Sequence, residues 1–152
     1  MTTVVPAFHR PADTRRRFLL TAAAGTMLPG IAAASPIQVA VLIRRLVGDA
    51  QLDRGRVKLD LPVLVENGNT VAMTVSVDAP PGTVESLHVF AEANPQPEVL
   101  RLVFGPRSGV PRIQARIRLA TSQTVVAIAR MHDGTFWQDS VDLLVTLAAC
   151  ID

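Results

Sequence analysis

The stretch Val71-Ala72-Met73-Thr74-Val75-Ser76-Val77-Asp78 decides the fold class, because larger apolar residues alternate with small or polar ones at every second position. A period of two is typical of a β-strand that buries one face and exposes the other. The upstream segment Val57-Lys58-Leu59-Asp60-Leu61 repeats the pattern. Both segments are therefore predicted to be half-buried strands.

Further strand-like segments follow downstream, each bounded by Pro, Gly or Asn: residues 84–92, 98–104, 112–120, 124–132 and 135–147. Two dipeptides predict tight hairpin turns, since Asn-Gly and Asp-Gly tolerate positive φ values: Asn67-Gly68 and Asp133-Gly134. About seven short strands, spaced roughly ten residues apart, favour an all-β fold. We expect an immunoglobulin-like antiparallel sandwich of two sheets.

One short helix should precede the strands. Ser35 can cap a helix, Pro36 suits its first turn, and Gly48 closes the apolar run at residues 37–47. No internal repeat and no second domain follow this helix.

The first 34 residues have the features of a twin-arginine export signal. Arg15-Arg16-Arg17 precede an apolar run at residues 18–34, which ends in the small residues Ala32-Ala33-Ala34. A retained membrane anchor is the alternative, but the run is short for a span that needs about 20 residues. We predict that residues 1–34 are a signal peptide cleaved before Ser35, and that residues 35–152 work in the periplasm without a membrane anchor.

The basic character of the chain comes from this leader. The leader holds four of the 15 basic residues and only one of the 13 acidic residues, so its removal changes the formal charge from +2 to −1. With 4% aromatic residues and no basic block after the leader, the mature chain lacks the usual features of nucleic-acid binding.

Cys150 is the single cysteine, so no internal disulfide can form. It follows the last predicted strand, on a segment that is usually frayed unless docked. From the residues alone, three roles stay open: a reactive thiol, an intermolecular bridge, or a small buried apolar residue.

Other catalytic or metal sites have little support in the sequence. His88 and His132 lack the spacing of metal ligands and are interpreted as structural or surface histidines. A hydrolase built from Cys150, His132 and Asp133 would need the C-terminal tail to fold back and stay fixed. We expect neither a metal nor a cofactor.

A family resemblance runs over about residues 36–150, carried by these segments: Glu66-Asn67-Gly68-Asn69-Thr70-Val71, Val75-Ser76-Val77-Asp78, His88-Val89-Phe90-Ala91-Glu92, Asn94-Pro95-Gln96-Pro97-Glu98-Val99, Pro106-Arg107-Ser108-Gly109, Arg116-Ile117-Arg118-Leu119-Ala120, Val125-Val126-Ala127 and Asp133-Gly134. With the leader and a cysteine third from the C-terminus, the chain resembles the SoxY family of thiosulfate-oxidation sulfur carriers.

The resemblance implies that thiosulfate-derived sulfur is held covalently on Cys150 and processed there by other enzymes of the Sox system. It also implies a heterodimer with SoxZ, a second small β-sandwich subunit, and no enzymatic activity in this chain. The arm at residues 148–152 reads Ala-Ala-Cys-Ile-Asp, where the family has Gly-Gly-Cys-Gly-Gly. The alternative function is a periplasmic immunoglobulin-like binding module in which Cys150 is dispensable.

Overall fold

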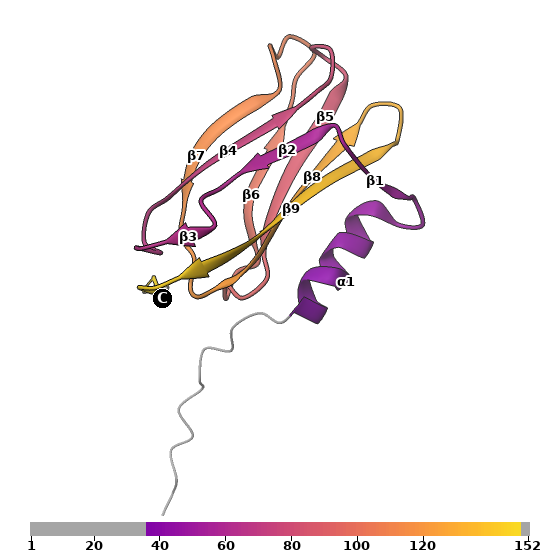
Figure 1. Cartoon of the computed structure of the whole chain (residues 1–152). Coiled ribbons are helices and arrows are strands. Elements are labelled where there is room, and N and C mark those ends of the chain that lie inside the picture. The colour runs from indigo at the N-terminus through magenta and orange to yellow at the C-terminus, as the bar shows by residue number, and fades with distance from the viewer. Residues whose placement is uncertain (1–35, 150–152) are drawn as a thin grey trace, which may run out of the picture. The chain divides into compact units, whose positions relative to one another are not determined.

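The computed structural model describes residues 36–149 (Figure 1). The expectations for the signal peptide, the Ser35 cap and Cys150 lie outside this range. One helix is followed by nine strands: α1 (Pro36–Val47), β1 (Leu52–Arg54), β2 (Val57–Asp60), β3 (Leu64–Val65), β4 (Val71–Val77), β5 (Val84–Ala91), β6 (Glu98–Val103), β7 (Arg112–Ile117), β8 (Gln123–Met131) and β9 (Phe136–Val145).

The strands form two sheets, which confirms the predicted sandwich. The larger sheet has the order β1-β9-β8-β5-β6, with β3 also paired to β9, and the smaller sheet has the order β2-β4-β7. Most neighbours are antiparallel, but β1 and β3 each run parallel to β9. All seven predicted strands are present, and the two further strands, β1 and β3, have three and two residues and are too short to show a period in the sequence.

The main core lies between the sheets and follows the alternation seen in the sequence. Val71, Met73, Val75 and Val77 of β4 are all buried, while the residues between them are exposed or half-buried. They pack with inward side chains of β5 and β8, including Leu87 and Val89. Burying one such side chain contributes about 1.5–3 kcal/mol, so the alternating pattern accounts for the pairing of the two sheets.

Helix α1 covers the outer face of the larger sheet. Val39 and Val47 pack in a second apolar cluster with Phe90, Ile128 and other residues of β5, β8 and β9. The strands β5 and β8 are therefore buried on both faces along most of their length, a feature that the strand prediction for residues 84–92 and 124–132 did not include. The predicted helix itself is confirmed, and it ends where Gly48 adopts φ of 65°. Within residues 36–149, no helix has the length and apolar content needed to cross a membrane.

Of the two predicted turns, only one is a tight hairpin. Gly134 has φ of 84° and joins β8 to β9, as expected for Asp133-Gly134. Gly68 does not adopt positive φ. The strands β2 and β4 are antiparallel neighbours, but the chain between them first leaves the smaller sheet so that β3 can pair with β9. The Asn67-Gly68 hairpin prediction was therefore wrong.

Candidate functional site: the base of the C-terminal arm

The residues that precede Cys150 are bound to the body of the protein. After β9 ends, the Thr146 N–H donates to the Val65 carbonyl at 2.9 Å, and the Leu147 carbonyl accepts from the Gly68 N–H at 2.8 Å. The Ala149 N–H then donates to the Leu119 carbonyl at 3.1 Å. We call residues 146–149 the arm base. The chain is docked as far as Ala149, although a frayed end was the expectation for an undocked tail.

Gly68 lies where three backbone segments meet. Its N–H binds Leu147, and its carbonyl accepts a hydrogen bond of 2.9 Å from the Leu119 N–H. A Cβ atom at this position would lie 2.4 Å from the Leu119 carbonyl oxygen and 2.9 Å from the Ala149 nitrogen. Glycine is needed because a side chain would push the arm base away from its partners.

The sequence contained the signal for this contact, but the signal was interpreted as a turn. The Asn67-Gly68-Asn69 segment does have local turn chemistry, since the Asn69 N–H donates to Asn67 Oδ1 at 3.0 Å. The close backbone approach at Gly68 involves Leu119 and Ala149, which are far away in sequence. No local pattern could have shown it.

The arm base carries no charge. Leu147 is 59% exposed, Ala148 is exposed and Ala149 is half-buried. No Lys, Arg or His occurs in residues 143–152, so the tail has no cation of its own to stabilise a thiolate.

The structure does not bring His132 and Asp133 to the arm base. Both precede β9, whereas the arm base follows it, and the ten residues of β9 span about 33 Å. Asp133 instead caps the β8–β9 hairpin. It accepts hydrogen bonds from the Thr135 hydroxyl at 2.7 Å and the Thr135 N–H at 2.9 Å, which lower the pKa of the Asp133 carboxyl. This separation excludes the hydrolase arrangement considered from the sequence.

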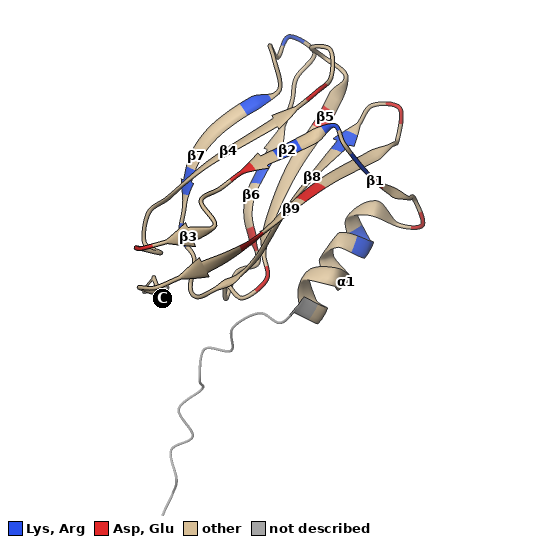
Figure 2. Ribbon diagram, in the orientation of Figure 1, with Lys and Arg blue, Asp and Glu red and all other residues tan. Residues whose placement is uncertain are grey.

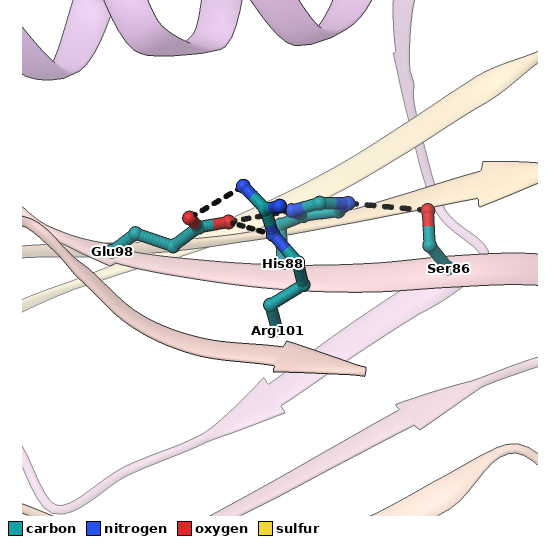
Figure 3. A network of polar contacts seen from close by, with 4 residues as sticks. All are labelled: Ser86, His88, Glu98 and Arg101. Carbon is teal, nitrogen blue, oxygen red and sulfur yellow. Dashed lines mark hydrogen bonds and ion pairs between the residues drawn. The ribbon is translucent and has the colours of Figure 1, made fainter. Parts of the chain in front are cut away.

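His88 belongs to a polar network on the outer face of the larger sheet, near α1 (Figure 3). Its Nδ1 lies 2.8 Å from Glu98 Oε1, and its Nε2 lies 3.1 Å from Ser86 Oγ. Arg101 binds the same carboxylate through Nε at 3.0 Å and a terminal nitrogen at 2.7 Å. With both ring nitrogens partnered and only 6% of the residue exposed, His88 is a satisfied structural histidine.

The network favours an ionised Glu98. Burial alone would raise the pKa of this carboxyl, but the hydrogen bonds from Arg101 and His88 hold the pKa below its usual value. The network lines a groove of about 450 Å³ between α1 and the strands β5 and β6. Among residues 36–149, no three His, Cys, Asp or Glu side chains gather in a group that could hold a metal ion.

Comparison with known proteins gives one family and one fold. Residues 43–150 match the family model of the sulfur oxidation protein SoxY. The sulfur carrier protein SoxY from Chlorobium limicola f thiosulfatophilum aligns with a TM-score of 0.62 and 24% identity, covering 74% of this chain and 100% of that one. A superoxide reductase (neelaredoxin) from Ignicoccus hospitalis aligns with a TM-score of 0.51 and 20% identity, covering 60% and 80% of the two chains. At these identities the structures show a shared fold alone. A search of curated proteins finds no match.

Proposed function

Because the chain belongs to the SoxY family of sulfur oxidation proteins, we propose that it is a sulfur carrier that holds thiosulfate-derived sulfur covalently on Cys150. The observation that supports this proposal best is the position of the cysteine. The family match extends to residue 150, and Cys150 is bonded directly to Ala149, the last docked residue of an exposed, uncharged arm base.

The chemistry proceeds in two steps that balance. First, Cys–SH and thiosulfate form Cys–S–S–SO₃⁻ and release one proton, while two electrons pass to an electron-accepting partner enzyme. Water then cleaves the bond between the sulfane sulfur and the sulfonate group, so that sulfate and a proton leave and Cys–S–SH remains. The arm offers no cation to either step, so we assign the catalysis to the partner enzymes and the carrier role to this chain.

The proposal also includes the compartment in which the protein works and the subunit with which it forms a stable complex. A periplasmic location, reached by the twin-arginine route with cleavage before Ser35, fits the leader sequence. A SoxZ-like sandwich subunit would form the heterodimer, through an interface of roughly 1,200 Å² or more. N-terminal mass spectrometry of the native protein, and size-exclusion chromatography after co-expression with the neighbouring subunit, test these two points.

The test of the carrier function compares wild type with Cys150→Ser. Both proteins are purified from native cells grown with and without thiosulfate, and their intact masses are measured before and after reduction. The wild type should carry a reducible sulfur adduct in thiosulfate-grown cells, and Cys150→Ser should carry none and should stop thiosulfate oxidation. If Cys150→Ser cells oxidise thiosulfate normally, the carrier function is wrong and the binding-module alternative takes its place.

A further inference from the structure

Several large apolar side chains near the arm base are exposed to solvent. Eight such side chains are exposed among residues 36–149, and four of them lie on two neighbouring segments: Val63 (65% exposed), Leu64 (58%), Leu144 (61%) and Leu147 (59%). We call these four residues the arm-base strip. The other four are divided between α1, β6 and the segment before β7. Single exposed apolar residues are ordinary, whereas a group of them marks a contact surface.

Backbone pairing holds the strip together. Leu64 of β3 lies opposite Leu144 of β9 in a parallel register, which directs both side chains to the same face. The Leu144 N–H donates to the Val63 carbonyl at 2.8 Å, and the Leu147 carbonyl is held by Gly68. Leu64 and Leu144 therefore lie on one face of two paired strands, and Val63 and Leu147 adjoin this pair along the chain.

The strip is also free of charge. Neither residues 61–65 nor residues 143–149 contain Asp, Glu, Lys or Arg. In Figure 2 the end of β9 accordingly carries neither blue nor red. A partner for this surface would be recognised by apolar contact, with the acidic residues Glu66 and Asp142 next to the strip.

The position of Cys150 limits what can cover this surface. Cys150 is bonded to Ala149, whose N–H is bound to Leu119, and consecutive Cα atoms are about 3.8 Å apart. The reacting sulfur can therefore lie at most about 7 Å from the Ala149 Cα while the arm base stays docked. Leu144 lies five residues before Ala149, at most about 17 Å away, so an enzyme with an interface of ordinary size that holds this sulfur can also contact the strip. A subunit bound permanently over the strip would compete with such an enzyme for the same surface.

We propose that the arm-base strip is the docking surface for the enzymes that act on the Cys150 adduct, and that the rim of their active-site entrance is apolar where it meets Leu64 and Leu144. The proposal rests on the carrier function and identifies the part of this chain that those enzymes hold. Docking on the strip raises the local concentration of the adduct at the active site. It therefore lowers KM and leaves the chemical step unchanged.

The experiment uses an adduct made without any enzyme. Tetrathionate reacts with the Cys150 thiolate to give Cys–S–S–SO₃⁻ and thiosulfate, a balanced exchange that needs no docking surface. The loaded full-length protein is then given to the sulfate-releasing enzyme purified from the same cells, and sulfate release is measured against carrier concentration. The variants are Leu64→Lys with Leu144→Lys, and Val110→Lys as the control, since Val110 is 74% exposed outside the strip.

The double variant should load with tetrathionate at the wild-type rate and melt at the wild-type temperature, while its KM with the enzyme rises at least tenfold and kcat is unchanged. Val110→Lys should behave as wild type. A KM within twofold of wild type overturns the docking proposal. So does loss of a stable dimer by the double variant in size-exclusion chromatography, which would make the strip a subunit interface. If wild-type adduct releases no sulfate at all, the carrier function itself has failed.

Discussion

The backbone N–H of Ala149 donates a hydrogen bond of 3.1 Å to the carbonyl of Leu119. Leu119 follows β7 of the smaller sheet, whereas Ala149 follows β9 of the larger sheet, so this bond ties the chain next to Cys150 across the sandwich. The docked arm base fixes the position of Ala149, the residue to which Cys150 is bonded. It also means that an enzyme with a deep active site would have to break a few backbone hydrogen bonds to draw the arm in.

The first prediction concerns the glycine beneath this contact. In Gly68→Ala the new Cβ atom would clash with the Leu119 carbonyl oxygen, 2.4 Å away, and would displace the arm base. We expect a loss of roughly 1–3 kcal/mol in the free energy of unfolding and faster hydrogen exchange at the Ala149 amide. Denaturant titration and exchange mass spectrometry measure these effects. Gly109→Ala is the matched control, since no atom lies within 4 Å of its added Cβ; equal behaviour of the two variants would contradict the role given to Gly68.

The second prediction concerns the packing of α1. Val39 is 1% exposed against the larger sheet, so Val39→Asp places a charge in an apolar cluster and should cost about 3 kcal/mol or more. We expect a clear drop in melting temperature. Ile37→Asp, two residues earlier and 76% exposed, should have little effect. If both variants melted together with wild type, α1 would not be packed on the sheet in solution.

The elements that could be predicted correctly from the sequence are those whose structure depends on the local pattern of residues. The alternation at Val71–Val77 correctly placed β4 with one face in the core, and Asp133-Gly134 correctly placed a hairpin. The double burial of β5 and β8 could not be derived in this way, because it depends on α1 folding back over a sheet built from residues 50 to 100 positions downstream.

The candidate site also has one part that the sequence could reveal and one part that it could not. The cysteine could be singled out from its isolation in the sequence, but its fixed base could not, because the contacts of Ala149 and Leu147 are made by backbone atoms of remote residues. Backbone contacts carry no side-chain signature beyond the glycine that permits them. Similarly, β3 has only two residues and exists because the edge of β9 is available to pair with it.

The third prediction is a pH dependence that arises from Glu98. The pKa of this carboxyl is lowered in the folded protein, so its ionised form stabilises the fold above the unfolded pKa, and this stabilisation is lost as the pH falls through the folded value. Glu98→Gln should therefore be less stable than wild type at pH 7, by roughly 1–2 kcal/mol for the weakened charged hydrogen bonds. The difference should shrink below about pH 4.

Urea unfolding at pH 7 and pH 3.5 measures this difference. Glu92→Gln serves as the control, because the described part of the chain gives the Glu92 side chain no hydrogen-bond partner. A Glu98→Gln deficit that is the same at both pH values would show that the loss comes from packing rather than from the ionised carboxylate.

The last prediction tests whether the arm base must detach for catalysis. Replacing Ala148 and Ala149 with glycine keeps the backbone N–H that binds Leu119 but widens the range of conformations open to a detached arm. At about 0.5–1 kcal/mol per residue, the pair should favour the detached state by roughly 5- to 30-fold. If partner enzymes act only on the detached arm, sulfate release from the loaded carrier should speed up, and the Ala149 amide should exchange faster by a similar factor. Ala50→Gly, at an exposed position after α1, controls for a general loss of stability.

Faster exchange without faster sulfate release would mean that the enzymes accept the arm in its docked form. The family's glycine pairs would then need a different physical explanation.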